Sequence, residues 1–251
     1  MKDKLLKKIL GIFGYKIIEK NVFKNQRSLS IKSWFTIDLI LEQIFSKNKI
    51  NYLIQIGAND GDRFDTLNHY IKKYKTKSIL VEPIKENFEQ LKNNYKDCNF
   101  ITFDNSAISV DNEISYLYKV NPKKIHEYSD HIPGITSFNK DHLIKHGVKS
   151  THIVKDNVDS ITIKDLIEKH NLKKFDLLFL DVEGYDGKII NDFFTNAKCR
   201  PIIILEYIHI ENKIFQILIN NLKENKYSFF SIDENMICFP EESGRDLFNF
   251  S

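Results

Sequence analysis

The sequence predicts an α/β fold whose central sheet is mainly parallel. Apolar runs of five to seven residues, rich in Ile, Leu, Val and Phe, recur along the chain from residue 52. Longer stretches with helical periodicity separate most of these runs. Strands that are apolar on both faces and joined by helices are the pattern of a parallel sheet covered by helices on both sides.

The expected elements follow one another in a regular order. The expected strands cover residues 52–57, 78–82, 99–103, 175–181, 201–207, 227–232 and 235–239. The expected helices between them cover residues 63–74, 86–95, 186–195 and 211–225. Pro83 ends the second strand. The last two strands flank the turn residues Asp233 and Glu234, so we expect them to form an antiparallel hairpin.

Residues 49–251 form the expected main domain. Within it, residues 104–174 contain an insertion that interrupts the alternation. Two extra strands are expected there, at 113–119 and 151–155, around a polar stretch rich in histidine. Long irregular segments of this kind often cover binding sites, so we expect a lid over a substrate.

Composition indicates a globular protein with a sizeable core. Of the 251 residues, 42% are hydrophobic and 28% are charged, which argues against global disorder. No apolar run approaches the ~20 residues of a membrane span. The net charge of +3 is too small to indicate a nucleic-acid binder. The three cysteines lack metal-binding spacing and fit a reducing compartment, so we expect a cytoplasmic protein.

Residues 1–48 form an expected N-terminal helical arm, with a strongly apolar helix at 34–46. Residues 1–27 hold eight basic and two acidic residues, a net charge of +6, whereas the rest of the chain holds 29 basic and 32 acidic residues, a net charge of −3. Apolar residues at near-helical spacing between lysines are typical of a helix on an anionic membrane surface, here the inner face of the membrane. The same pattern fits a helix that docks on the main domain or on a second copy of the chain in a homodimer.

A glycine-rich turn follows the first expected strand. The sequence IGANDGD places Gly57, Ala58, Asn59 and Gly61 between that strand and the next helix. Glycine permits a tight turn and the close approach of a ligand, and open parallel sheets bind ligands beyond the carboxyl ends of their strands. The turn lacks the third glycine of the dinucleotide fingerprint and the lysine of a phosphate-binding loop. An ordinary strand–helix turn is the structural alternative.

The ends of the second and third strands add polar groups. Glu82 ends the second strand, where an acid can accept hydrogen bonds from ribose hydroxyls. Asp104, Asn105 and Ser106 follow the third strand, where they offer acceptors to an adenine amino group or form a capped turn. The glycine turn and Glu82 together favour a nucleoside-containing cofactor without a pyrophosphate. S-adenosylmethionine fits that description.

Acidic residues gather at the ends of the fourth and fifth strands. LDVEGYD supplies Asp181 and Glu183, and LEYIH supplies Glu206 and His209. Neighbouring carboxylates at a sheet edge cost folding free energy unless they are paired, exposed or functional. The structural alternative to a functional role is that they cap helices or form salt bridges. Asp181, Glu183 and His209 are the candidates for a general base. Metal dependence is not favoured, and Asp181 and Glu206 are the residues that would hold Mg²⁺.

Taken in order, IGANDGD, ILVEP, NSAIS, LDVEGYD and PIIILEY resemble the FkbM-type family of S-adenosylmethionine-dependent methyltransferases over about residues 50–210. The resemblance implies a Rossmann-like class I methyltransferase fold with a mainly parallel seven-stranded sheet, an antiparallel C-terminal hairpin, N-terminal helices and an inserted lid. It implies cofactor contacts at Gly57, Ala58, Asn59, Gly61, Glu82, Pro83, Asn105, Ser106, Ala107 and Asp181.

We expect the binding site for the methyl acceptor to involve the insertion. The ITSF segment, with Thr136 and Ser137, resembles a Ser-bearing segment of the family, and we expect His131 and Glu206 to contact the acceptor as well. One residue departs from the family pattern. Gln55 stands two residues before the first glycine, where the family usually has an acid. A missing carboxylate there would change the contact with the methionine amino group.

The activity that the resemblance implies is O-methylation of a hydroxyl on a sugar or glycan precursor, such as a precursor of capsular or other surface polysaccharide. The protein would align the acceptor, exclude water and remove a proton. Methyl transfer to a phosphate-type oxygen is one alternative. A noncatalytic binding or scaffold protein that keeps the fold is another, and Gln55 is its best support. The slightly acidic main domain argues against a nucleic-acid substrate.

Overall fold

The computed structural model describes residues 36–47, 50–63, 65–110, 116–129 and 132–242. The basic segment 1–27 lies outside these residues, as do the expectations of membrane contact and of docking that rest on it. The described residues from Ile37 onward belong to one unit, Ile37–Ser251. None of the described helices is long and apolar enough to cross a bilayer.

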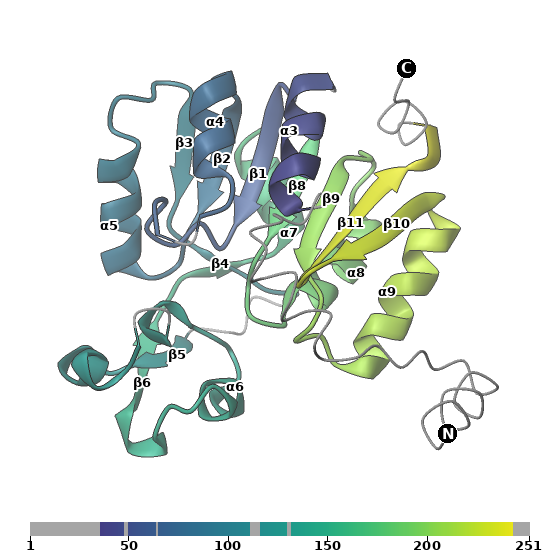
Figure 1. Cartoon of the computed structure of the whole chain (residues 1–251). Coiled ribbons are helices and arrows are strands. Elements are labelled where there is room, and N and C mark those ends of the chain that lie inside the picture. Colours follow the sequence, from purple (N-terminus) through teal and green to yellow (C-terminus); the bar gives the residue numbers. More distant parts are fainter. Residues whose placement is uncertain (1–35, 48–49, 64, 111–115, 130–131, 243–251) are drawn as a thin grey trace, which may run out of the picture. The chain divides into compact units, whose positions relative to one another are not determined.

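Seven strands form one sheet in the order β10-β11-β9-β8-β1-β2-β3 (Figure 1). Their bounds are Tyr52–Ile56 for β1, Lys77–Val81 for β2, Ile101–Asp104 for β3, Leu177–Leu180 for β8, Ile202–Glu206 for β9, Tyr227–Ile232 for β10 and Asn235–Pro240 for β11. Strands β3, β2, β1, β8 and β9 pair in parallel, and β11 is antiparallel to both β9 and β10. The predicted sheet and its C-terminal hairpin are confirmed.

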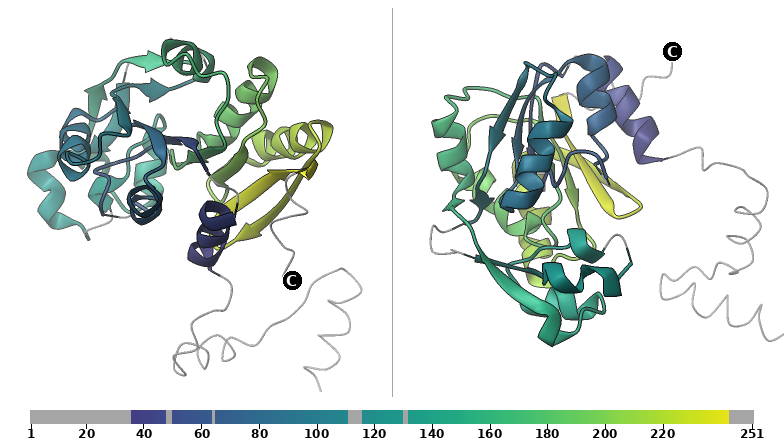
Figure 2. Two further views of the ribbon diagram at one scale, coloured as in Figure 1. Left: turned by 90° about the horizontal axis from the view of Figure 1, so that it is seen from above. Right: turned by 90° about the vertical axis from the view of Figure 1, so that its left-hand side faces the viewer.

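Helices cover both faces of this sheet (Figure 2). One face packs against α3 (Ile37–Lys47), α4 (Asn68–Tyr74) and α5 (Lys85–Asn94), and the other against α7 (Ile163–Lys169), α8 (Asp186–Asn196) and α9 (Asn212–Glu224). Alternate residues of β1 face opposite cores, with Leu53 in the first and Ile54 and Ile56 in the second. The central strands β1, β2, β8 and β9 bury apolar side chains on both faces, which explains their continuous apolar sequences.

Two helices begin three or more residues later than the sequence predicts. The helix expected from residue 63 begins at Asn68, because side-chain carboxylates bind the main chain ahead of it. Asp60 accepts the N–H groups of Asp62 and Arg63, and Asp65 accepts that of Leu67. Local bonds of this kind compete with the helix. The helix expected at 34–46 begins at Ile37 and buries its apolar side in the main core, so it is part of the main unit and not of a separate arm.

The inserted region has a small core of its own. It contains β5 (Tyr116–Val120), which pairs with β6 (Ile153–Asn157), and between them the short helices η1 (Pro122–Glu127), η2 (Ile132–Gly134), α6 (Lys140–Lys145) and η3 (Ser150–His152). Its buried side chains are Val120, Ile132, Ile135, Leu143 and Val148.

The flanks of the insertion belong to the sheet domain. Two short strands, β4 (Ala107–Ile108) and β7 (Ser160–Ile161), pair in parallel outside the main sheet. Helix α7 follows and packs on the core, and it begins with a capping box between Thr162 and Asp165. The irregular part is therefore narrower than the expected range of 104–174.

Candidate functional site

A cavity of about 490 Å³ opens at the carboxyl ends of four parallel strands. Gly57 after β1, Glu82 after β2, Asp181 after β8 and Glu206 at the end of β9 line its sheet side. The inserted region closes the opposite side with the segment Gly134–Phe138 and further side chains. A cavity of this size lies in the range of small-molecule sites, roughly 300–1,000 Å³.

The turn after β1 folds over the tip of β2. The main-chain N–H groups of Gly57 and Ala58 both donate to the Val81 carbonyl oxygen at 3.0 Å. Gly57 has a φ of +86°, and a Cβ there would overlap the main-chain oxygen of Asp181. The close approach of two strand ends therefore requires glycine at this position. Asn59, with a φ of +49°, takes a left-handed conformation that asparagine tolerates.

Glu82 fixes this turn from the neighbouring strand end. Its side chain accepts the N–H of Asn59 at 3.0 Å on Oε2 and the N–H of Ile84 at 2.9 Å on Oε1. Burial raises the pKa of Glu82 to about 7, although these N–H groups and Asn87 act in the opposite direction. Glu82 also lines the cavity. Each carboxylate oxygen keeps a second lone pair that can accept a ligand hydroxyl.

Two residues of the expected cofactor set do not line the cavity. A Cβ on Gly61 would lie 2.8 Å from a ring carbon of Tyr95, so this glycine allows the turn to pack on α5. The Asn105 side chain donates to the main-chain oxygens of Glu82 and Pro83, at 2.8 and 3.1 Å. Gly61 thus serves packing on α5 and Asn105 braces the end of β2, and the contact of these two residues with a cofactor stays a prediction.

The turn after β3 is held by a buried carboxylate. Asp104 accepts the Ser106 hydroxyl at 2.7 Å and forms ion pairs with Lys169 at 2.9 Å and His170 at 2.6 Å. Burial acts to raise the pKa of Asp104, but Lys169, His170 and Ser106 together hold it below its usual range. Asp104 thus anchors the turn to α7, while Ser106 and the next residue, Ala107, line the cavity as expected.

Gln55 presents an unsatisfied acceptor at the cavity. Its side-chain Nε2 donates to Asp65 Oδ1 at 3.0 Å, whereas its buried Oε1 has no hydrogen-bond partner among the described residues. Both residues line the cavity. Burying an acceptor without a partner costs about 1–3 kcal/mol, so a donor group of a ligand would be favoured there. Asp65 was not among the residues predicted for the site, because no sequence pattern places its carboxylate beside Gln55.

The acids expected at the fourth and fifth strands meet in the cavity wall. The protein around the cavity partly desolvates Asp181, and this desolvation together with the neighbouring charge of Glu183 raises its pKa to about 7, although the side chain faces the open cavity. Burial and the charges of Asp181 and Glu183 raise the pKa of Glu206 to about 9. Asp181 is exposed on the wall, and no described residue donates a hydrogen bond to its side chain. The buried Oε2 of Glu206 also has no partner among the described residues.

The residues expected to contact the methyl acceptor lie opposite these acids. Thr136 and Ser137 line the cavity together with Phe138. The ring of Phe138 packs on the ring of Tyr185 at a centroid distance of 4.6 Å, which joins the inserted segment to the turn before α8. His131 lies outside the described residues.

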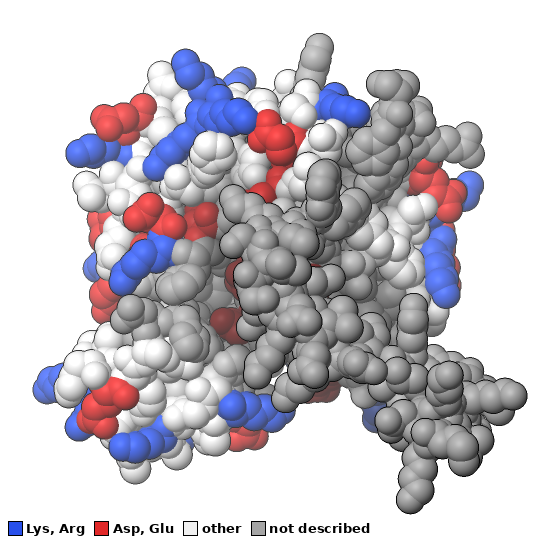
Figure 3. All heavy atoms as spheres, viewed as in Figure 1, with Lys and Arg blue, Asp and Glu red and all other residues white. Residues whose placement is uncertain are grey.

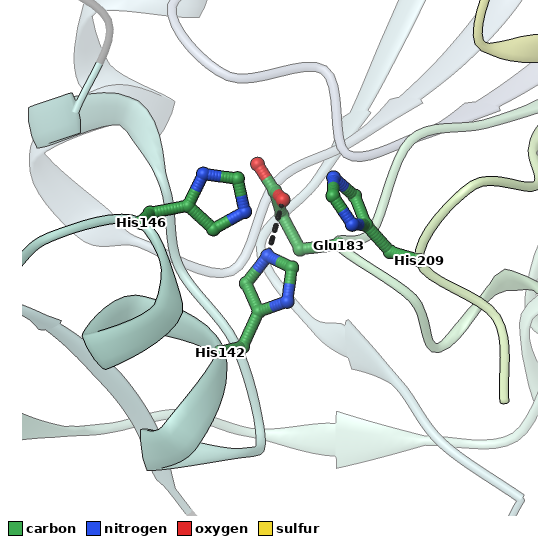
Figure 4. A group of neighbouring side chains, drawn as sticks. All are labelled: His142, His146, Glu183 and His209. Atoms are coloured by element: carbon green, nitrogen blue, oxygen red, sulfur yellow. Dashed lines mark hydrogen bonds and ion pairs between the residues drawn. The ribbon is translucent and has the colours of Figure 1, made fainter.

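Two histidines of the insertion approach the expected base candidates. His142 on α6 and His146, directly after it, lie beside Glu183 and His209 (Figure 4). The Nε2 atom of His142 is 2.7 Å from Glu183 Oε2. Burial lowers the pKa of His209, and the nearby His142 adds to that effect. The four-residue spacing of His142 and His146 is the sequence signal that could have identified them as a pair.

The order of the sheet, with β11 antiparallel between β10 and β9, is that of the class I methyltransferase fold. The family model of the methyltransferase FkbM domain matches residues 55–229. The chain therefore belongs to the FkbM family of S-adenosylmethionine-dependent methyltransferases. None of the curated proteins matches the sequence.

Solved structures with a similar fold include other methyltransferases. The methyltransferase FkbM of Methylobacillus flagellatus KT has a TM-score of 0.47 and 15% identity, over 80% of this chain and 47% of that chain. An O-methyltransferase of Bacillus cereus in complex with SAH has a TM-score of 0.42 and 11% identity, over 87% of this chain and 88% of that chain. A methyltransferase of Geobacter sulfurreducens has a TM-score of 0.44 and 7% identity, over 92% of this chain and 95% of that chain. The chain spans about half the length of the Methylobacillus protein.

The residues present fit S-adenosylmethionine. The unpaired Oε1 of Gln55 offers an acceptor to an ammonium group. Glu82 offers carboxylate oxygens to ribose hydroxyls at the end of β2. The cavity between them is large enough for a nucleoside-containing ligand.

Proposed function

We propose that the protein O-methylates a hydroxyl of a sugar or glycan precursor, with S-adenosylmethionine as methyl donor. The observation that carries the proposal is the cavity at the strand ends, where Gln55, Glu82 and Asp181 line one wall. A precursor of capsular or other surface polysaccharide is the acceptor class that we favour. Such precursors are made in the cytoplasm or at the inner face of the membrane, where we place the protein.

The cofactor would be held along the ends of β1, β2 and β3. Glu82 would accept its ribose hydroxyls, Gln55 would accept from its ammonium group, and Ser106 and Ala107 would border its base. S-adenosylmethionine supplies a methyl group on a sulfonium, which departs as a neutral thioether when an acceptor oxygen attacks the methyl carbon. The protein needs only to align the acceptor, exclude water and receive its proton.

A hydroxyl-rich acceptor suits the remaining walls. Thr136, Ser137 and Asn87 offer hydrogen-bonding groups, and Phe138 offers an apolar face. A second hollow of about 450 Å³ shares Asn59, Asn87, Gly134 and Thr136 with the first. This continuity supports an elongated acceptor, such as a sugar attached to a carrier group.

The visible surface charge supports a small acceptor over a nucleic acid. On the face shown in Figure 3, Lys and Arg side chains of the described residues alternate with Asp and Glu side chains. A nucleic-acid interface would instead gather basic side chains over a broad area.

We propose Asp181 as the acceptor of the hydroxyl proton. Its side chain is exposed on the cavity wall and receives no hydrogen bond from a described residue, so it is available to a substrate hydroxyl. Glu183 and His209 line the same wall and are its nearest alternatives. Proton removal by a positioned side chain contributes ~10²–10⁴-fold to a rate.

Titration calorimetry tests the cofactor. We expect the purified full chain to bind S-adenosylmethionine and S-adenosylhomocysteine. Gln55→Ala should weaken the binding of S-adenosylmethionine by about tenfold or more, because the variant loses a hydrogen bond to a charged group. Gln216→Ala is the matched control, since Gln216 is exposed on α9. The absence of binding at millimolar cofactor would reject the proposal and favour the noncatalytic scaffold.

A panel of acceptors tests the reaction. Free sugars, nucleotide-linked sugars and organic phosphates are incubated with the chain and methyl-labelled cofactor, and the labelled product is identified by mass spectrometry. We expect the label on a sugar hydroxyl. Label on a phosphate oxygen would replace the sugar acceptor with the phosphate-type alternative. A chain that binds the cofactor but labels no member of any class would contradict the proposed acceptor.

A further inference from the structure

Four side chains of metal-ligating type converge at the edge of the cavity (Figure 4). His142 and His146 come from α6 and its end, Glu183 from the turn after β8, and His209 from the turn after β9. One ligand atom from each side chain lies within 4.8 Å of the other three. Among the described residues this is the only such group of three or more His, Cys, Asp and Glu side chains.

The three imidazole rings surround the single carboxylate. Ring centroids are 4.6 Å apart for His142 and His146, 4.8 Å for His142 and His209, and 5.1 Å for His146 and His209. Among the described residues, His142 is the hydrogen-bond partner of the Glu183 carboxylate, and none forms a hydrogen bond with the ring of His146. Rings this close repel one another when protonated, whereas neutral rings can direct their lone pairs at a shared cation.

Local structure holds the four groups in place. His142 and His146 are four residues apart, so one turn of helix places them on the same side. Glu183 has a φ of +53°. A Cβ on Gly184 would lie 2.7 Å from the main-chain oxygen of His209, so the two turns touch through a glycine. The side chains of His142, Glu183 and His209 are 11%, 22% and 25% exposed, which leaves them half-buried and reachable.

We propose that His142, His146, Glu183 and His209 bind one divalent ion of the zinc type. Imidazole nitrogen with one carboxylate oxygen is a donor set for Zn²⁺ and its first-row neighbours, whereas Mg²⁺ and Ca²⁺ prefer oxygen. Ligand atoms around a tetrahedral Zn²⁺ lie roughly 3.4 Å apart, so closure needs side-chain movements of about 1 Å. These four ligands differ from Asp181 and Glu206, the residues predicted from the sequence as those that would hold Mg²⁺.

The ion would face the acceptor. His146, Glu183 and His209 line the cavity together with Asp181. A bound divalent ion lowers the pKa of a coordinated water from 15.7 to about 7 in known enzymes, and it acts on a substrate hydroxyl in the same way. The acceptor hydroxyl would bind as a fifth ligand beside the four side chains, and its proton would pass to Asp181. This role rests on the proposed function, whereas the metal site itself does not.

Cobalt and zinc titrations of the full chain test the site. The chain is freed of metal with a chelator and titrated with Co²⁺ while visible absorption is recorded, and then with Zn²⁺ and Mg²⁺ in a calorimeter. We expect one Co²⁺ per chain with the strong absorption of a tetrahedral site, displacement by Zn²⁺, and no heat with Mg²⁺. A chain that binds neither Co²⁺ nor Zn²⁺, or that binds Mg²⁺ equally well, would overturn the proposal.

Variants locate the ion. His146→Ala and Glu183→Gln should each weaken Zn²⁺ binding by at least tenfold. His126 is an exposed histidine of the same insertion, and His126→Ala should bind Zn²⁺ as the wild type does. Thermal melting without metal shows whether each variant is folded. Unchanged binding in both folded variants would place the ion elsewhere and overturn the assignment. If His146→Ala does not fold, Glu183→Gln alone decides.

The two proposals fail separately. Metal binding is measured without cofactor, and cofactor binding is measured on the metal-free chain. Zn²⁺ binding without cofactor binding would leave the metal site standing and reject the methyltransferase. Cofactor binding with no metal bound would leave the methyltransferase proposal standing and reject the metal site. The His142–Glu183 hydrogen bond would then be a polar contact between the insertion and the sheet.

Discussion

Gly184 lies so close to His209 that a side-chain carbon on the glycine would meet the His209 main-chain oxygen at 2.7 Å. Gly184 also has a φ of +90°, which L side chains rarely adopt. The contact joins the turn after β8 to the turn after β9. It therefore sets the distance between Glu183 and His209, two of the proposed metal ligands.

Gly184→Ala should destabilise the protein by about 1–3 kcal/mol from backbone strain, and by more from the overlap. Gly147→Ala is the matched control, because Gly147 has a φ of +87° but no atom within 4 Å of an added Cβ. Urea denaturation of both variants separates strain from contact. Equal losses of unfolding free energy in the two variants would show that the close approach of Gly184 to His209 does not contribute to the loss.

Asp181→Asn should lower the turnover number by ~10²–10⁴ if Asp181 receives the acceptor proton. Binding of S-adenosylhomocysteine should stay within a few-fold of the wild type, since that ligand has no acceptor hydroxyl. Asp233→Asn, in the exposed turn between β10 and β11, is the control. Turnover that survives in Asp181→Asn would transfer the role to Glu183 or His209.

The stability contributed by Glu82 should fall as the pH rises. Its pKa is about 7 in the folded chain against 4.5 for an ordinary glutamate, because burial disfavours the charge. The folded state thus binds the proton more tightly, and its advantage is complete below pH 4.5 and lost as the pH approaches about 7.

Denaturation of wild type and Glu82→Gln across this pH range tests the effect. The variant cannot titrate at this position, so the stability difference between the two proteins should change with pH up to about 7 and then level off. Glu89→Gln is the control, since Glu89 is exposed on α5. A difference that does not vary with pH would contradict the raised pKa of Glu82.

Asp104→Asn should cost about 1–3 kcal/mol, because it removes the buried carboxylate that pairs with the Lys169 ammonium and the His170 ring. The folded pKa of Asp104 is lowered, so its contribution is present above the unfolded pKa of 3.8 and is lost as the pH falls further. Asp97→Asn, exposed before β3, serves as control. Guanidinium denaturation at neutral pH measures both, and similar stabilities would refute the role of Asp104.

Much of the cofactor side could be predicted from sequence. Gly57 and Glu82 directly follow apolar strands, and parallel strands bring their carboxyl ends to one edge of the sheet. The same local pattern also suggested Gly61 and Asn105, which do not line the cavity. A glycine that is needed for packing on α5 and an amide that braces β2 look the same in sequence as residues that contact a ligand.

The sequence by itself determined the order of strands and helices, because burial on two faces requires continuous apolar runs and turns require particular residues. Only the tertiary structure decided which distant side chains meet. His142 reaches Glu183 across 41 residues, and Gln55 finds Asp65 through a turn that delays α4. The first contact depends on how the insertion folds over the sheet, and the second depends on the turn after β1. Side-chain periodicity indicates which face of an element a residue occupies, but not which distant residue it contacts there.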